Sequence, residues 1–317
     1  VQYDKLLVAT GSKPFVPPMK DIDKVEDKFT FMTWDSAKAI REKVTAGTKV
    51  LIIGAGLIGL KCAEALHHLN ADITVVDLAD RILPSILDVR AGEIMQKHIE
   101  DKGTKFILGT SVEQFSKNSA KLTNGETVDF DILVIAVGVR PNTELVSDAG
   151  GKVEKGIITD LHQQTTIDNV YAAGDCTVSH DCSSNTDRIL ALLPNAFMQG
   201  EVAGKNMAGE ETLYLNAIPM NAIGFYGLHI ITAGSYDGDE DITEDADKEI
   251  YKKLVFKDGL LKGFILMGDV ARAGIYTSMI KEQIPLTEVD LDLLRDKPQM
   301  MMFGKARREE KLAGKKH

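Results

Sequence analysis

Three glycines carry the clearest chemical meaning in this sequence. Gly54, Gly56 and Gly59 follow the apolar run VLII in the spacing G-x-G-x-x-G. In that spacing the first glycine permits a tight turn, the second lets the backbone approach a pyrophosphate, and the third lets a helix lie close to the strand. The N–H groups that open the helix, at Leu57 and Ile58, then face the phosphates. The pattern predicts a dinucleotide site; the alternative is a glycine-rich turn without a ligand.

Asp77 ends a second apolar run, ITVV, 18 residues after Gly59. A carboxylate at that point accepts hydrogen bonds from the hydroxyls of an adenine ribose and repels a 2′-phosphate. We therefore expect NADH to be preferred over NADPH. The order strand, glycine turn, helix, strand and acid predicts a Rossmann-like unit between Val50 and Asp77.

The composition limits the classes of function. The 317 residues are 44% apolar, which suits a globular protein of two or three domains. A net charge of −10 disfavours nucleic acid as a partner, and no apolar run approaches the ~18 residues of a membrane-spanning helix. Three cysteines are too few for a disulfide framework, so we expect a cytoplasmic location.

The remaining pattern predicts the elements that position these residues. Three apolar strands end on a glycine, in LLVATGS (6–12), LVIAVGVRP (133–141) and NVYAAGDC (169–176), and we expect these ends to converge on cofactor edges. Helices are expected at 33–44 with Thr33 as N-cap, at 89–102, after Pro194 and at 269–282. Strands are expected near 106–108, 112–115, 120–122 and 132–137, with hairpin turns at Asn124-Gly125 and Asp258-Gly259. The acidic run 237–247 is expected to be a solvated loop.

With these segments in view, the chain resembles the FAD-dependent pyridine nucleotide-disulfide oxidoreductase family, in the branch of NADH:rubredoxin reductases, NADH oxidases and the flavin portion of nitrite reductases. The resemblance runs through YDKLLVATGSKP, VLIIGAGLIGLKCAEAL, VVDLADRILP, ILVIAVGVRPNTEL, TTIDNVYAAGDC, LLPNAFMQGEVAGKNMAG and MNAIGFYGLHIITAG. It implies an α/β fold with a Rossmann-like NAD domain (33–140) inserted in an FAD domain (1–32 and 141–215). These domains are followed by an α+β interface domain (216–296), which forms homodimers. A solvated or helical tail (297–317) comes last.

The resemblance also implies roles for residues outside the glycine turn. Ala9, Thr10 and Gly11 match a segment that passes near the flavin cofactor. Gly174 and Asp175 match a pair whose carboxylate accepts hydrogen bonds from the ribityl or pyrophosphate region. Pro194, Asn195 and Ala196 match a helix start whose N–H groups stabilise negative charge on the reduced flavin ring. Gly138 matches a position along the nicotinamide.

Two features depart from the family pattern. No strand-GxGxxG-helix unit for the FAD adenosine diphosphate precedes Tyr3, so we expect an upstream segment to be missing and FAD binding to be weakened or absent. No Cys-x-x-x-x-Cys dithiol is visible. Cys62 is expected to pack as a small apolar group, and Cys176 and Cys182 to lie on a loop near the flavin. The histidines His67, His68 and His180 lack a ligand set, and no metal is expected.

The resemblance implies an enzyme that takes a hydride from NADH onto FAD and passes electrons to a small redox protein, dioxygen or a sulfur compound. Hydride transfer needs no side-chain acid or base, so no catalytic residue is assigned. Phe225 and Tyr226 are candidates for the acceptor face. The alternatives are a non-catalytic NAD-binding and dimerisation module without flavin, and a flavin-free Rossmann dehydrogenase, against which the ATG and AAGD segments argue.

Overall fold

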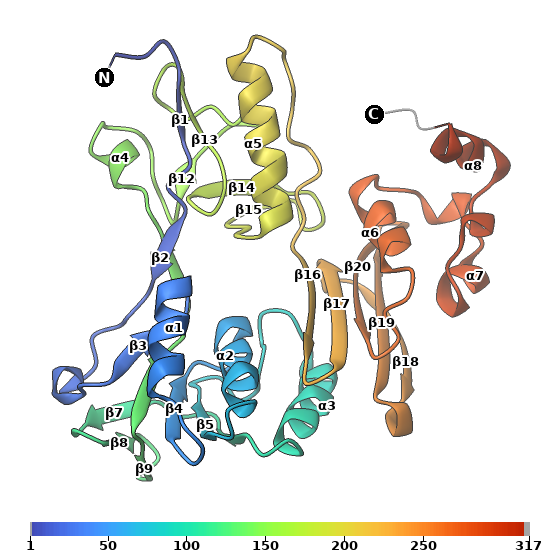
Figure 1. Ribbon diagram of the computed structural model, residues 1–317. Coiled ribbons are helices and arrows are strands. Elements are labelled where there is room, and N and C mark those ends of the chain that lie inside the picture. The colour runs from blue at the N-terminus through green and yellow to red at the C-terminus, as the bar shows by residue number, and fades with distance from the viewer. Residues whose placement is uncertain (1, 314–317) are drawn as a thin grey trace. The chain divides into compact units, whose positions relative to one another are not determined.

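The two apolar runs that flank the glycine turn are neighbouring strands of one parallel sheet. In the computed structural model, which describes residues 2–313, this sheet has the order β3-β10-β4-β5-β6. The strands of the sheet are β3 (Lys28–Thr30), β10 (Ile132–Ile135), β4 (Lys49–Ile53), β5 (Asp72–Val76) and β6 (Lys105–Ile107). Strands β3, β4 and β5 are labelled in Figure 1. Side chains at Val50, Leu51 and Ile52 are no more than 1% exposed, as expected for a strand with both faces covered. The predicted Rossmann-like unit is therefore present.

Three helices accompany this sheet: α1 (Trp34–Lys43), α2 (Leu57–His67) and α3 (Val89–Glu100). The helix expected after Thr33 is confirmed, because the Thr33 hydroxyl accepts a hydrogen bond from Ser36 N in a capping box. The hairpin at Asn124-Gly125 is also confirmed, within an antiparallel sheet of β7 (Val112–Phe115), β8 (Ser119–Leu122) and β9 (Thr127–Asp129). Strand β10 ends at Ile135, two residues earlier than expected. The strands β2 (Ser12–Pro14) and β11 (Val139–Pro141) form a separate pair.

The chain divides into two compact units. Unit 2 takes in residues 13–140 and 224–228, and unit 1 takes in the remaining described residues. Unit 2 includes the residues before α1, among them β3, which pairs with β10 in the parallel sheet.

Unit 1 contains the two other strands that end on a glycine. β1 (Leu6–Val8) and β13 (Val170–Ala172) form a parallel pair. The other elements of this part are α4 (Glu144–Ser147), β12 (Ile157–Ile158), β14 (Thr177–Asp181), β15 (Thr186–Arg188) and α5 (Leu193–Met207). Helix α5 carries Pro194 in its first turn, as expected, where the missing proline N–H has no cost. Val8, Ile157 and Ala172 share one small buried cluster.

The C-terminal part of unit 1 is built on an antiparallel sheet of order β16-β17-β20-β19-β18. The strands are β16 (Met220–Phe225), β17 (Leu228–Gly234), β18 (Asp239–Asp245), β19 (Ile250–Lys257) and β20 (Leu260–Met267). The helices are α6 (Ala273–Lys281), α7 (Leu291–Asp296) and α8 (Lys305–Leu312). The hairpin at Asp258-Gly259 is confirmed. Helix α6 begins four residues later than expected, because Arg272 adopts a left-handed φ of 64°.

The expectation of a loop at the acidic run 237–247 is wrong. Most of the run is the edge strand β18, which pairs with β19. Basic side chains from neighbouring elements offset the repulsion between its carboxylates: Lys253 lies 2.5 Å from Glu240, and Arg295 lies 2.6 Å from Asp241. Charges on an edge strand also oppose pairing with another chain.

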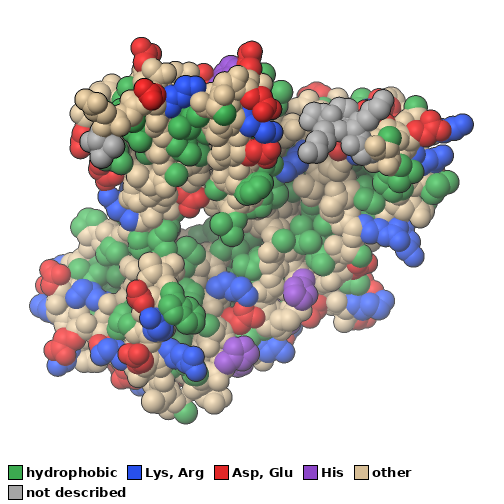
Figure 2. All heavy atoms as spheres, turned by 45° about the horizontal axis from the view of Figure 1, so that its top comes forward, with side chains coloured by type: hydrophobic (Ala, Val, Ile, Leu, Met, Phe, Trp, Pro, Cys, Tyr) green, Lys and Arg blue, Asp and Glu red, His purple; other side chains and the backbone are tan. Residues whose placement is uncertain are grey.

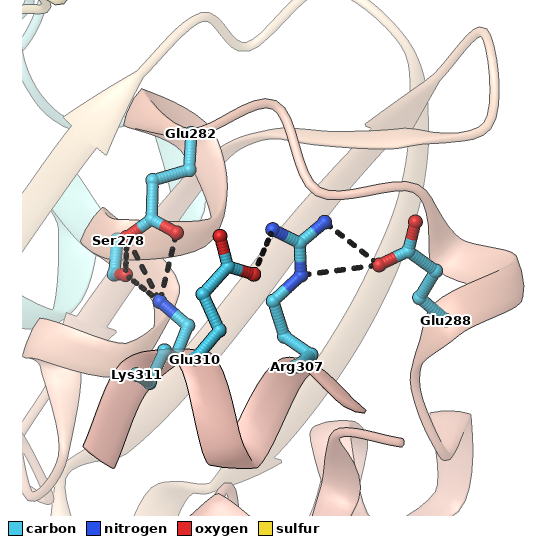
Figure 3. Close-up of polar contacts among 6 residues, drawn as sticks. All are labelled: Ser278, Glu282, Glu288, Arg307, Glu310 and Lys311. Carbon is cyan, nitrogen blue, oxygen red and sulfur yellow. Dashed lines mark hydrogen bonds and ion pairs between the residues drawn. The ribbon is translucent and has the colours of Figure 1, made fainter. Parts of the chain in front are cut away.

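The described part of the C-terminal tail contains a short 3-10 turn at Met300–Met302 and the helix α8. Figure 3 shows Arg307 and Lys311 of α8 in contact with Glu288 and Glu282 of the preceding chain. Arg307 lies 2.8 Å from Glu288, and Lys311 lies 2.8 Å from Glu282 and donates to the Ser278 hydroxyl. The last basic residues of the tail, Lys315 and Lys316, lie outside the described residues.

The surface is mixed in charge. Figure 2 shows Lys and Arg side chains interspersed with Asp and Glu side chains over one face, without a continuous basic area on that face. Of the helices in the described range 2–313, none combines the length and the apolar character required to cross a membrane.

Candidate functional site

The glycine turn after β4 has the backbone that its sequence predicts. Gly54 adopts a φ of 112°, and a Cβ there would lie 2.3 Å from the Ala136 carbonyl oxygen. A Cβ on Gly59 would lie 1.9 Å from the Gly54 carbonyl oxygen, so only glycine allows α2 to approach the strand this closely. A Cβ on Gly56 would meet nothing within 4 Å. Gly56 therefore borders open space, whereas its two partners are required by the protein's own packing.

Helix α2 opens at this turn. Gly56 is its N-cap in an extended conformation, and Leu57 and Ile58 form its first turn. Their N–H groups have no acceptors within the helix, and the positive end of the helix dipole lies here. The open space beside Gly56 and these donors together suit a phosphate.

Asp77 is joined directly to the glycine turn. Its Oδ2 accepts a hydrogen bond from Ala55 N at 2.6 Å, and its Oδ1 accepts one from Ala79 N at 2.7 Å. A carboxylate has about four acceptor sites, so both oxygens retain capacity for ribose hydroxyls. Sequence reasoning assigned Asp77 to the ligand and missed that it also holds the turn. The Ala55 N–H, a backbone group, leaves no signal in the sequence.

Gly138 lies just after β10 in the same unit. It is exposed, has a φ of 107°, and a Cβ there would meet nothing within 4 Å. Its carbonyl accepts a hydrogen bond from Phe15 N at 2.9 Å, and the Arg140 guanidinium lies 4.2 Å from the centre of the Phe15 ring. The backbone of Gly138 is thus exposed, and the hydrogen bond from Phe15 N fixes its position.

The expected flavin segments meet in unit 1. Val8 pairs with Ala172 in register, and Ala173 N donates to Val8 O at 3.1 Å. Beyond the strand ends, the Ser12 hydroxyl donates to Asp175 Oδ2 at 3.2 Å. The segments 9–11 and 174–175 are therefore adjacent, although they lie more than 160 positions apart in the sequence.

Asn142 fixes the segment Ala9–Gly11. The Thr10 hydroxyl donates to Asn142 O at 2.6 Å, Asn142 Nδ2 donates to Thr10 O at 2.9 Å, and Asn142 N donates to Gly11 O at 2.9 Å. Gly11 has a φ of 65°, which glycine adopts without strain. Sequence reasoning missed Asn142 and Ser12; the only available signal was Asn142 following the RP dipeptide at the end of β11.

Gln199 of α5 holds the Gly174 turn. Its Oε1 accepts hydrogen bonds from Gly174 N at 2.5 Å and from the Thr177 hydroxyl at 3.3 Å, and its side chain is 2% exposed. A Cβ on Gly174 would lie 3.7 Å from Ala196 Cβ, so the turn and the start of α5 are in contact. Gln199 was also missed, because a polar residue in a helix of small residues carries no distinctive spacing.

The three residues at the start of α5 differ in what they expose. Pro194 is exposed and Ala196 is half-buried. The Asn195 side chain is fully buried: Nδ2 donates to Ile218 O at 3.0 Å, and Oδ1 accepts from the Tyr214 hydroxyl at 3.0 Å. Burial raises the pKa of Tyr214, which keeps this donor protonated. Only the backbone of Asn195, and not its amide, is available at the helix start.

The placement of Cys176 and Cys182 on one loop is wrong. They lie at opposite ends of β14, and both are buried free thiols. Cys176 donates to Ala173 O at 3.3 Å, and burial raises the pKa of Cys182. Cys62 is fully buried in α2, as expected, and burial raises its pKa to about 12. Thiols in such surroundings are poor nucleophiles.

The assignment of Phe225 and Tyr226 to an acceptor face stays a prediction. Both belong to unit 2, and Phe225 is fully buried there. Tyr226 packs against the ring of His67 at the end of α2. His180 lies on strand β14 and forms a 2.9 Å contact with Asp187. Within residues 2–313, no group of three or more His, Cys, Asp or Glu side chains is arranged to hold a metal ion.

Comparisons with known proteins agree with this geometry. The sequence model described as "Pyridine nucleotide-disulphide oxidoreductase" matches residues 1–200, and that described as "Rubredoxin NAD+ reductase C-terminal domain" matches residues 219–284. The chain is 33% identical over 298 residues to the NADH-dependent phenylglyoxylate dehydrogenase subunit epsilon of Aromatoleum evansii, covering 90% of this chain and 70% of that protein. It is 38% identical over 222 residues to an NADH oxidase of Methanocaldococcus jannaschii, covering 68% and 49%.

A similar solved structure is an NAD-dependent persulfide reductase from A. fulgidus, with a TM-score of 0.81 and 27% identity, covering 91% of this chain and 59% of that one. The chain thus spans about half to two thirds of the length of most of these proteins.

Proposed function

The chain belongs to the pyridine nucleotide-disulphide oxidoreductase family, and we propose that it moves electrons from NADH through FAD to an acceptor. The observation that carries the proposal is the turn Gly54–Gly59 with Asp77. Its outer glycines are required by packing, whereas Gly56 borders open space at a helix N-terminus. That combination suits a pyrophosphate better than a purely structural turn, in which all three glycines would serve packing.

The residues present fit NADH in unit 2. The N–H groups of Gly56, Leu57 and Ile58 would hold the pyrophosphate, and Asp77 would accept hydrogen bonds from the ribose hydroxyls and repel a 2′-phosphate. Gly138 would offer its bare backbone edge to the nicotinamide. These groups bind and orient; none of them has to move a proton.

The residues present also fit part of an FAD site in unit 1. Thr10 and Gly11 are fixed by Asn142, and Asp175 is fixed by Ser12, so both segments are preorganised. The α5 start would direct the backbone N–H group of Asn195 at developing negative charge, whereas the Ala196 N–H already donates to Leu192 O at 2.9 Å. FAD, when bound, supplies the hydride acceptor that no side chain of this protein provides.

The acceptor, assembly and location complete the proposal. The relatives differ in their acceptors, because one is named an NADH oxidase and another an NAD-dependent persulfide reductase. We therefore propose an acceptor drawn from small redox proteins, dioxygen and sulfur compounds. The sheet β16–β20 with α6 would form a homodimer interface, since residues 219–284 match a reductase C-terminal domain. A cytoplasmic location fits the three reduced, buried thiols.

The test is calorimetric titration of the purified chain with NADH and NADPH, followed by NADH-dependent reduction of ferricyanide with FAD added. The proposal expects NADH to bind more tightly than NADPH, and FAD to be required for dye reduction. Absence of NADH binding would refute it. NADH binding without flavin absorbance or dye reduction would instead support the alternative, a non-catalytic NAD-binding and dimerisation module.

A further inference from the structure

The turn between β16 and β17 has a backbone that its sequence does not favour. Tyr226 and Gly227 occupy the two central positions with φ of 50° and 91°. These values belong to a two-residue type I′ hairpin, in which Asn, Asp or Gly usually takes the first position. A bulky side chain is strained there, and such strain persists only where the surroundings hold the residue. The contacts of Tyr226 must therefore account for its presence.

Tyr226 is held by three different elements of unit 2, to which residues 224–228 belong. Its N–H donates to Glu64 Oε1 of α2 at 2.6 Å. Its carbonyl oxygen lies 3.3 Å from His98 Nε2 of α3, and its hydroxyl lies 3.2 Å from Thr104 Oγ1, just before β6. Its ring meets the His67 ring edge-on at 5.2 Å.

A second residue of α2 holds the same turn. Lys61 Nζ donates to Gly224 O at 2.7 Å and lies 2.5 Å from the Glu64 carboxylate. The same ammonium lies 5.3 Å from the centre of the Phe225 ring. Lys61 and Glu64 are three residues apart and therefore share one face of α2. The turn is thus fixed through its backbone to α2 and α3, and through the Tyr226 side chain to His67 and Thr104.

The helix that holds the turn is the one whose first residues, Gly56–Ile58, bind the dinucleotide in the proposed function. Lys61 and Glu64 follow within two helical turns. We infer that Tyr226 is a positioning residue for dinucleotide binding: its ring and hydroxyl tie His67 of α2 to Thr104, so that docking of the 224–228 turn on α2 and binding of NADH stabilise each other. The inference rests on the proposed function, and thermodynamic linkage makes the effect reciprocal.

Tyr226→Asn tests the inference by NADH titration. Asn adopts a positive φ readily, so the hairpin is kept while the ring and hydroxyl contacts are lost. We expect the Kd for NADH to rise at least about fivefold, the lower end of typical coupling between sites. Tyr226→Phe keeps the ring contact with His67 and should recover most of the affinity. Asp258→Asn is the matched control, because Asp258 occupies the same position of the β19–β20 turn with a φ of 53° and should leave the Kd unchanged.

Hydrogen exchange of the wild-type chain gives a readout that needs no variant. NADH should slow exchange in the peptide 222–228 by a similar factor, and should leave the peptide 256–262 around the control turn unchanged. Two outcomes would overturn the coupling alone, provided that the wild type binds NADH. The first is a folded Tyr226→Asn variant with an unaltered Kd for NADH. The second is a wild-type chain in which NADH adds no protection at 222–228. No NADH binding by the wild type overturns the proposed function and the coupling with it.

Discussion

Alanine at Gly59 should lower the stability of the fold, whereas alanine at Gly56 should lower the affinity for NADH, although both replace a glycine of one motif. A Cβ on Gly59 would lie 1.9 Å from the Gly54 carbonyl oxygen and 3.1 Å from its carbonyl carbon. Relief requires α2 to move away from β4. Overpacking of this kind costs up to about 3 kcal/mol, and the gain from alanine in a helix returns at most about 1 kcal/mol. We expect Gly59→Ala to be destabilised by ~2 kcal/mol.

Gly56→Ala should fold normally. Gly56 has a φ of −85° and a ψ of −174°, which any residue adopts, and a Cβ there meets nothing within 4 Å. Alanine is a poorer N-cap than glycine, and we expect a stability change within ~1 kcal/mol. The methyl group would occupy the space proposed for the pyrophosphate. A loss of ~1.4 kcal/mol, which is tenfold in Kd for NADH, is the least that we expect.

Thermal unfolding followed by circular dichroism, and calorimetric titration with NADH, separate these two effects. At ~2–4 °C per kcal/mol, Gly59→Ala should lower Tm by roughly 4–8 °C. Gly56→Ala should lose affinity with Tm nearly unchanged. The reasoning is refuted if Gly56→Ala binds NADH as tightly as the wild type, since the ligand would then not pass over Gly56. An unchanged Tm for Gly59→Ala would refute the close approach of α2.

Three further outcomes are expected. Asp77→Ala should weaken NADH more than NADPH in paired titrations, because it removes a ribose acceptor and a charge that repels a 2′-phosphate; an unchanged preference would contradict this role. Gln199→Leu should cost about 1–3 kcal/mol in urea unfolding, because Gly174 N and the Thr177 hydroxyl lose their buried acceptor. Burial acts to raise the pKa of Glu282, but hydrogen bonds from Lys311 and Ser278 outweigh it, and the pKa falls below 4.5. Glu282 therefore stabilises the folded state at pH values above its pKa in the unfolded chain. This contribution is lost as the pH falls through the pKa of Glu282 in the folded protein. Lys311→Ala should therefore flatten the acid side of a curve of Tm against pH.

The sequence predicted the elements whose causes are local. The glycine turn follows from backbone constraints within six residues, and the helix after Thr33 follows from a cap within three. The turn at Asp258-Gly259 was identified because both residues suit positive φ. The turn at Tyr226-Gly227 was missed because Tyr is rare in that conformation, and here contacts from Glu64 and Thr104 hold it.

Elements with distant causes were not predictable. The acidic strand β18 looks like a loop because its own residues disfavour a strand, and its charges are offset by Lys253 and Arg295, which lie outside it. Cys182 was expected on a loop near the flavin, yet it packs in the buried cluster of the C-terminal sheet. In both cases the residues that determine the structure belong to another element, so the local sequence pattern cannot predict it.

Some residues matched by motif have side chains that also hold the protein's own structure, and others do not. A substitution can locate a ligand only at residues of the second kind. Asp77, Asn195 and the missed Gln199 each hold the protein's own backbone or side chains in addition to any ligand. Substitution of any of them alters the shape of the site, so a loss of binding there does not locate a ligand. Gly56 accepts a hydrogen bond from Leu60 N through its backbone, which alanine would keep, and a Cβ there would meet nothing within 4 Å. Of the motif glycines, it is therefore the position where loss of NADH affinity with retained stability identifies the ligand's path directly.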